Sequence, residues 1–208
     1  TIRLAHVAGS ELHQTYARLT KLPLARYTTK LVIGEPGGDS YVPLVNAMLA
    51  SGILPRLTRL HLGETTNKRV HAGDVSALIA AIPELEELDL DVVTGTFGPF
   101  VSSTLRRFVL HGLDPAPLLG SLVPSLVELE LRACQGAALF VDRLPRSPIL
   151  LQLRRLTIWR CRFGDSELAS IAMHANRYRH LSAIDLRGNT FSARALAEAK
   201  EDLPNIVT

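Results

Sequence analysis

The sequence is poor in the residues on which most protein chemistry depends. It has two cysteines, one tryptophan and an aromatic share of 5% among 208 residues. Two cysteines are too few for a disulfide-stapled secreted domain, and they cannot form a structural zinc site alone. This low cysteine content favours a reducing cytoplasm. The small aromatic share indicates a core built mainly from Leu, Ile, Val and Ala.

Long apolar runs and an excess of one charge are also missing. No stretch approaches the roughly 18 apolar residues of a membrane-spanning helix. Thr1, Ile2 and Arg3 lead directly into an expected strand without a signal peptide, but the missing Met indicates processing or excision, which leaves an exported precursor open. The 23 basic and 20 acidic residues leave a net charge of +3. The two signs are interleaved along the chain, whereas nucleic-acid-binding proteins gather basic residues on one face. We therefore expect neither a membrane nor a nucleic acid as partner.

Motifs for metal binding, phosphate binding and nucleophilic catalysis are absent from the sequence. The seven histidines show no metal-binding spacing, and there is no Gly-x-Ser-x-Gly motif. The glycine-rich segment 34–40 follows an expected strand and precedes an expected helix, as phosphate-binding loops do. It lacks the lysine and the glycine spacing of those loops, and its two acidic residues would repel phosphate. The sequence thus predicts no cofactor, no metal site and no enzyme activity.

What the sequence does contain is a recurring Leu-x-x-Leu-x-Leu spacing, with similar apolar residues at its three fixed places. Apolar residues two apart indicate a strand with one buried face, and the residue three before them closes the turn into that strand. Successive copies begin between 20 and 29 residues apart, which is the range of a solenoid repeat. We expect seven parallel strands in one sheet, centred on Leu31, Leu60, Leu88, Phe108, Leu129, Leu156 and Ile184.

The segments between the repeats predict two kinds of connection. The long segments carry apolar residues at helical spacing over 45–53, 75–82, 168–175 and 195–199. Asp39 or Ser40, Asp74 and Ser192 are the candidate caps of these helices. The segments 91–104 and 113–117 contain Gly and Pro that interrupt a helix, and the second offers at most one short turn. We expect helices on the convex side at both ends of the array and mostly irregular connections in the middle.

The two ends of the chain carry weaker copies of the repeat. Residues 2–4 are expected to form a degenerate first strand, followed by a helix from about Ser10, and Ile206 opens an eighth strand. An open end of such an array exposes a strand edge and apolar side chains. We therefore expect either a further segment in the native gene or self-association through this end. One domain covers 1–208: an N-terminal cap or degenerate repeat at 1–27, repeats at 28–205 and the start of a further repeat at 206–208.

The repeats that end at Cys134, Cys161 and Asn189 resemble leucine-rich repeat proteins, because Leu-x-x-Leu-x-Leu is followed there by x-x-Cys or x-x-Asn. The long units look like the ribonuclease-inhibitor-like class, and the mixture of long and short units looks more like bacterial members. The resemblance implies an α/β leucine-rich repeat solenoid, or horseshoe, with a parallel sheet on the concave face and helices and irregular turns on the convex face. Less regular turns are expected where four residues depart from the pattern: Pro36, Thr65, Val93 and Leu113.

The two cysteines occupy the same place in adjacent repeats. Equivalent atoms there would be about 5 Å apart, a distance that a disulfide spans. The resemblance instead implies reduced thiols that turn inward toward the loop backbone, and this is the interpretation we favour for Cys134 and Cys161.

The strand register arranges the residues of the concave face in columns that run across the sheet. The first column alternates in sign from Arg59 to Arg155, which we interpret as a ladder of solvated ion pairs. The next two columns gather acidic residues at 86–91 and basic residues around Trp159. The first column consists of Lys30, Arg59, Glu87, Arg107, Glu128, Arg155 and Ala183.

Trp159 is the only tryptophan, and the register places it outward among arginines. Tryptophan and arginine are enriched in the hot spots of protein interfaces, and a rigid sheet presents such side chains at little cost in ordering entropy. The alternative is that the indole lies flat against Arg132 and Arg187 in cation–π contacts, without a partner. We predict a non-catalytic protein–protein interaction module whose partner has an acidic surface; the alternative is a structural or regulatory repeat domain of a larger protein. The candidate binding residues are Trp159, Arg132, Arg155, Arg160, Arg187, His111 and Glu130.

Overall fold

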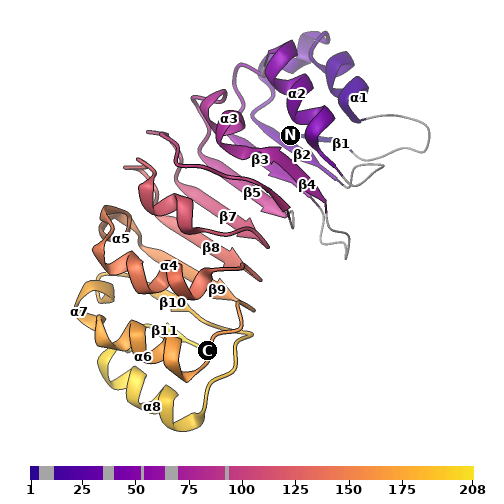
Figure 1. Cartoon of the computed structure of the whole chain (residues 1–208). Coiled ribbons are helices and arrows are strands. Elements are labelled where there is room, and N and C mark those ends of the chain that lie inside the picture. The colour runs from indigo at the N-terminus through magenta and orange to yellow at the C-terminus, as the bar shows by residue number, and fades with distance from the viewer. Residues whose placement is uncertain (5–11, 35–39, 53, 64–69, 92–93) are drawn as a thin grey trace.

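The main feature of the molecule is an open sheet of nine parallel strands, in the order β1-β2-β3-β5-β7-β8-β9-β10-β11 (Figure 1). The computed structural model describes residues 1–4, 12–34, 40–52, 54–63, 70–91 and 94–208. Some residues named in the sequence analysis lie outside these ranges. They are most of the glycine-rich segment 34–40, with Pro36 and Asp39, and also Ile53, Thr65 and Val93. The fold is therefore α/β with a single large parallel sheet.

All seven strands expected from the repeats are present and pair in the expected register. Leu129 lies opposite Phe108 on one side and Leu156 on the other, and all three side chains are buried. The prediction of the strands and of their parallel order is confirmed. The strands are β2 (Lys30–Ile33), β3 (Arg59–Leu62), β5 (Glu87–Asp91), β7 (Arg107–His111), β8 (Glu128–Arg132), β9 (Arg155–Trp159) and β10 (Ala183–Asp185).

The weak repeats at the two ends also form strands. β1 (Ile2–Leu4) pairs with β2, and β11 (Ile206–Val207) pairs with β10. The expected N-terminal helix is α1 (Leu12–Leu19), and Ser10 lies outside the described residues. At the other end Leu203 and Ile206 are buried, whereas Val207 is 44% exposed. The expectation of an uncovered end is therefore wrong for Leu203 and Ile206, because β11 joins the sheet and carries Ile206 onto the core beside Ile184. A further segment in the native gene, or self-association through this end, stays a prediction.

The caps expected for two of the helices are confirmed. The Asp74 carboxylate accepts hydrogen bonds from the backbone N–H groups of Ser76 and Ala77 at the start of α3 (Val75–Ala80). The Ser192 hydroxyl accepts one from Ala195 N at the start of α8 (Ala193–Asp202). These bonds satisfy N–H groups that have no partner within the helix.

The other two expected helices begin with one bond from a predicted cap, Ser40, and one that the sequence did not reveal, from Glu167. In α6 (Asp165–Met173) the Glu167 carboxylate accepts from Gly164 N at 2.8 Å. The Ser40 hydroxyl accepts from Val42 N at the first residue of α2 (Val42–Ser51). Further short helices that were not expected are α4 (Ala137–Arg143), α5 (Pro148–Gln152) and α7 (Ala175–Tyr178), with 3₁₀ turns η1 (Pro23–Tyr27) and η3 (Leu144–Arg146).

The middle of the array differs from the expected irregular connections. β4 (His71–Asp74) and β6 (Thr94–Thr96) pair in parallel as a second sheet of two strands. Extended segments of neighbouring units pair in this way because their backbone N–H and C=O groups need partners. The expected single short turn is present as the 3₁₀ helix η2 (Ala116–Gly120). Phe97, Phe100 and Phe108 fill the core of these units, with ring centroids 5.6 to 5.9 Å apart.

Three equivalent side chains link consecutive units by hydrogen bonds. The thiol of Cys134 donates to Leu110 O at 3.3 Å, and that of Cys161 donates to Leu131 O at 3.6 Å. The Asn189 amide donates to Ile158 O, the equivalent carbonyl of the next unit, at 2.7 Å. Both cysteines are free thiols, which confirms the inward, reduced arrangement. The neighbouring Cys161 side chain and burial raise the pKa of the Cys134 thiol.

Candidate protein-binding site

Trp159 ends β9 on the open face of the sheet, the face that carries no helices. The guanidinium carbon of Arg160 lies 4.2 Å from the centroid of its ring. A Cβ at Gly188 would come within 3.0 Å of the indole Nε1, so the backbone of Gly188 packs closely against the indole. The cation–π partner is therefore Arg160 and not Arg132 or Arg187. The reason is local: Arg160 has a left-handed φ of +53°, which ends the strand and brings its side chain over the ring.

An open hollow of about 450 Å³ lies beside Trp159 on this face. It gathers five of the seven candidate binding residues, whereas Arg155 and Arg160 lie outside it. Arg155 stands at the opposite end of β9, and Arg160 follows that strand. Thr157 and Asp185 were missed as candidates, although they stand in the same column of the register as Glu130. The lining residues are His111, Glu130, Arg132, Thr157, Trp159, Asp185 and Arg187.

Each arginine of the hollow is paired with an acidic residue two positions earlier in its own strand or turn. Arg132 Nε lies 2.7 Å from Glu130 Oε1, and Arg187 Nη2 lies 2.7 Å from Asp185 Oδ2. The hydrogen bond from Arg187 lowers the pKa of the Asp185 carboxyl. The basic cluster that the sequence indicates around Trp159 is thus partly neutralised, because residues two apart on a strand face the same side. The hollow presents fixed ion pairs beside an indole.

The charge ladder expected in the first column is present across the middle of the open face. Arg155 Nη1 lies 2.9 Å from Glu128 Oε1, and Arg107 Nε lies 3.6 Å from Glu128 Oε2. Arg107 also pairs with Glu130 at 3.2 Å, which connects this ladder to the hollow. Val109, whose register partner is Glu130, has no exposed surface although it faces outward. The centre of the open face is therefore closed by charged side chains and not open as a groove.

Of two histidine–carboxylate pairs on this face, the pair of His111 with Asp91 borders the hollow, and the pair of His61 with Asp89 lies on the neighbouring strands β3 and β5. The ring Nδ1 of His61 lies 3.1 Å from Asp89 Oδ2, and the hydrogen bond that the ring donates to this carboxylate raises the pKa of His61. His111 Nδ1 contacts Asp91 Oδ1, and this bond lowers the pKa of the Asp91 carboxyl. Within the described part of the chain, no group of three or more His, Cys, Asp or Glu side chains is placed to hold a metal ion.

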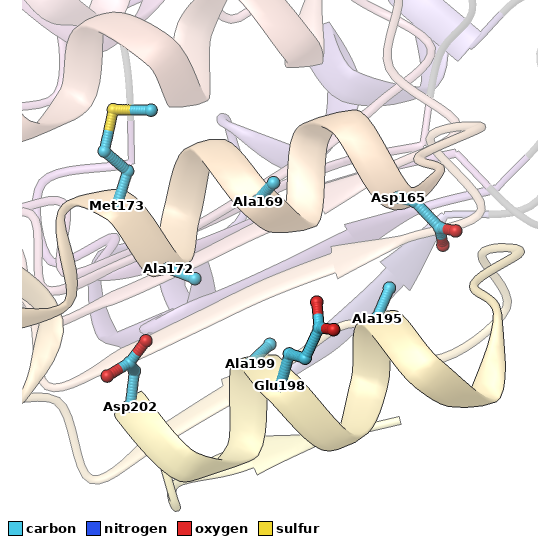
Figure 2. A pocket seen from close by; sticks show the side chains of 8 residues that line it. All are labelled: Asp165, Ala169, Ala172, Met173, Ala195, Glu198, Ala199 and Asp202. Atoms are coloured by element: carbon cyan, nitrogen blue, oxygen red, sulfur yellow. The ribbon is translucent and has the colours of Figure 1, made fainter.

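A separate, smaller groove of about 250 Å³ lies between α6 and α8 (Figure 2). Alanine side chains line much of it, with acidic residues at its two ends, and Met173 points away from α8 (Figure 2). Asp165 accepts a hydrogen bond from Ser192 N at 2.8 Å, and Glu198 pairs with Arg194 at 2.8 Å. This groove is a seam between two helices with small contact residues, and it contains no candidate binding residue.

No protein-family profile and no curated protein matches this chain. A crystal structure of a Bacteroides fragilis protein, solved as a structural genomics target, is similar to it with a TM-score of 0.72 and 16% sequence identity. The match covers 100% of this chain and 73% of that one. At this identity the likeness shows a shared fold alone. Among the residues with described positions, no helix has the length and apolar character needed to cross a membrane.

Proposed function

We propose that this protein is a leucine-rich repeat solenoid and that it recognises another protein through the open, concave face of its sheet, without chemistry of its own. The in-register parallel strands support the solenoid, as do the hydrogen bonds by which Cys134, Cys161 and Asn189 link consecutive units. In such an array each unit packs only on its neighbours, which yields an extended face suited to binding.

The observation that carries the proposed function is the hollow beside Trp159. Its volume of about 450 Å³ lies in the range of roughly 300–1,000 Å³ in which proteins bind small groups. A tryptophan bordered by ordered arginine pairs is the composition of an interface hot spot. Because these side chains are already held by Arg160, Glu130 and Asp185, binding would cost little additional ordering.

The exposed fractions of two ion pairs favour an acidic partner, whereas in the pair of Arg132 with Glu130 the two fractions are nearly equal (26% and 23%). Arg187 keeps 64% of its side chain exposed, whereas Asp185 keeps 16%. Arg155 keeps 56% exposed, against 35% for Glu128. In both pairs the cation reaches farther into solvent than the anion, so an approaching surface meets positive charge first. Association with an acidic surface should then weaken as salt is added.

The test is affinity capture by the immobilised protein, compared across matched variants. Trp159→Ala removes the indole from the hollow, and Met173→Ala removes an exposed side chain (79%) from the helical side. We expect Trp159→Ala to lose its specific partners while its circular dichroism and thermal unfolding stay close to those of the parent. Met173→Ala should retain the same partners. If Trp159→Ala captures every partner with the affinity of the parent, the hollow is not the binding site.

A further inference from the structure

A second cavity, of about 580 Å³, lies beyond the ends of β8 and β9. The turns that follow these two strands line it, together with the first residues of α4. Arg160 lines this cavity and also lies over the ring of Trp159, which lines the hollow of the open face. The cavity therefore adjoins the hollow of the open face but has its own walls.

The charge in this cavity is positive and uncompensated. Arg160 and Arg162 line it, and both are exposed. The rest of the lining consists of Ala, Cys, Gln and Gly. The Asp114 carboxylate packs against Gly136 in the wall, but no carboxylate of the described ranges is among the lining residues. Neither arginine forms an ion pair with an acidic residue in those ranges, in contrast to Arg132 and Arg187 of the hollow. Two guanidinium groups are thus left available to an acidic group from outside.

The backbone around the cavity is held in a conformation that side-chain-bearing residues seldom adopt. Ala133, Arg160 and Arg162 have φ values of +48°, +53° and +61°. They are all of the non-glycine residues with positive φ in the described part of the chain, and all three line this cavity. Left-handed backbone is disfavoured for residues with a Cβ, and such residues concentrate at binding and catalytic sites. Gly112 and Gly188, which stand at the places equivalent to Ala133 and Arg160, also have positive φ (+76° and +77°), so the left-handed turn at that place belongs to the repeat. Arginine replaces the Gly or Ala of neighbouring units at Arg160, and Arg162 adds a second left-handed residue two positions later.

We propose that this cavity receives an aspartate or glutamate side chain of a protein segment bound on the adjacent open face. A carboxylate matches the planar fork of a guanidinium, and charge-assisted bonds of this kind are stronger than neutral ones. The inference rests on the proposed function, since it names the chemistry of the partner. It assigns the anchoring contact to Arg160 and Arg162, and not to the paired arginines of the hollow.

The chain contains two reporters of an occupied cavity. Trp159 is the only tryptophan, so its emission reports any movement of Arg160 over its ring. Cys161 lines the cavity and is half-buried, whereas Cys134 is buried, so alkylation of the native protein reports mainly on Cys161. The probe is a pentaglutamate peptide with blocked ends, and pentaglutamine with the same ends is its control.

We expect pentaglutamate to change the emission of Trp159 in a saturable way, to slow alkylation of Cys161 and to bind less tightly as salt is added. Pentaglutamine should do none of these. Equal effects of the two peptides would overturn the proposal. Inorganic phosphate serves as a third probe, and binding of phosphate without binding of pentaglutamate would mean a small-anion site and would overturn the peptide occupant.

The variants separate loss of binding from loss of folding. Arg160→Asn and Arg162→Asn together remove both guanidinium groups, and asparagine tolerates left-handed φ better than arginine does. Calorimetry should show affinity for pentaglutamate reduced about tenfold or more, while resistance to urea is kept. Arg179→Asn, which changes an exposed arginine of ordinary φ (−60°), is the matched control and should bind as the parent does. Unchanged affinity in the double variant would overturn the assignment.

A variant of the hollow distinguishes failure of this inference from failure of the proposed function. Arg132→Gln with Arg187→Gln should leave the affinity for pentaglutamate within about threefold of the parent. If this variant loses the peptide while the double asparagine variant keeps it, the cavity is the wrong site, but recognition through the open face stands. If Trp159→Ala keeps every captured partner while the peptide still requires Arg160 and Arg162, the proposed function fails, and the cavity alone remains as a binding site.

Discussion

The guanidinium carbon of Arg160 lies 4.2 Å from the centroid of the Trp159 ring, and this contact connects the hollow of the open face with the cavity beyond β8 and β9. Trp159 lines the hollow of the open face, and Arg160 lines the cavity beyond the strand ends. A group bound in either place that displaces one partner of the contact therefore alters the wall of the other. Cation–π contacts at exposed sites contribute about 0.5–1 kcal/mol. Moving Arg160 away from the indole would therefore cost little free energy.

Gly188 should be required for this contact. Its φ of +77° is unfavourable for alanine, and a Cβ there would lie 2.9 Å from Arg160 Cγ and 3.0 Å from Trp159 Nε1. We expect Gly188→Ala to lower the free energy of unfolding by about 1–2 kcal/mol and to shift the emission of Trp159. Gly120→Ala is the control, since its nearest neighbour would be Pro99 Cγ at 3.4 Å. Equal destabilisation by the two changes in urea melts would contradict the close packing of Gly188 on the indole.

Leucines at the fixed places of the repeat should dominate stability. Leu156 is fully buried between its register partners Leu129 and Ile184, whereas Leu151, in α5 of the preceding unit, is 63% exposed. We expect Leu156→Ala to cost about 2–5 kcal/mol, the range for buried leucines. Leu151→Ala should stay within about 0.5 kcal/mol of the parent. A loss below about 1 kcal/mol for Leu156→Ala in urea unfolding would mean that this position is not part of the core.

Asn189 should stabilise the contact between two consecutive units. Its amide donates to Ile158 O and Leu186 O, and its carbonyl oxygen accepts from Phe163 N. Removing these bonds leaves backbone groups unsatisfied, so Asn189→Ala should cost about 1–3 kcal/mol in urea unfolding.

A cysteine at this position is an informative comparison for Asn189→Ala. Cys134 and Cys161 occupy the equivalent places and donate to the corresponding carbonyls. Asn189→Cys should therefore retain part of the stability that Asn189→Ala loses. The remainder is lost because a thiol is a poor acceptor for Phe163 N. If cysteine and alanine are equally destabilising, the bonds to the preceding unit contribute nothing measurable.

Stability should depend on pH through His61. Its hydrogen bond with Asp89 raises its pKa above the ordinary value of 6.5. The stabilisation is therefore complete below about pH 6.5 and is lost as the pH rises through the higher pKa of the folded state. The parent should exceed His61→Gln in the free energy of unfolding by about 0.5 kcal/mol at pH 5.5, the size of a partly exposed ion pair. This difference should shrink by pH 8.5.

The control for this pH dependence is His174→Gln, which changes a histidine that follows α6 and lies outside the sheet. Its stability should run parallel to that of the parent between pH 5.5 and 8.5. Urea unfolding at several pH values measures all three proteins. A constant difference between the parent and His61→Gln across this range would remove the His61–Asp89 pair as the cause.

The sequence was sufficient for the strands and their register. Positions such as Leu129 and Leu131 are two apart and apolar, which requires a strand with one buried face, and a one-residue slip would expose both. The ion-pair ladder followed from the same register, because Arg155 and Glu128 stand in one column. The pairing of Arg132 with Glu130 was also implied by their spacing of two residues. Because of this pair, the positive charge around Trp159 is smaller than the number of arginines indicates.

Other features had little signal in the sequence. The left-handed backbone at Arg162 could not be predicted, since arginine gives no sign of positive φ. For Arg160 the only sign lay in other units, where Gly112 and Gly188 occupy the equivalent place. The second sheet, formed by β4 and β6, was not predicted because its short strands lack an alternating apolar pattern. The cavity beyond β8 and β9 was not predicted either, because its shape depends on local backbone conformation and on the turns of two different units.

The sequence by itself therefore determined the array: which residues are core, which face outward and which stand side by side on adjacent strands. These follow from the spacing of apolar residues, because burial acts on every repeat in the same way. The tertiary structure alone decided the proposed binding surface, namely that Arg160 covers Trp159 and that Arg132 and Arg187 are paired, whereas Arg160 and Arg162 have no acidic partner among the residues with described positions. Those outcomes depend on single side-chain contacts and on the φ of individual residues, which a repeating pattern does not encode.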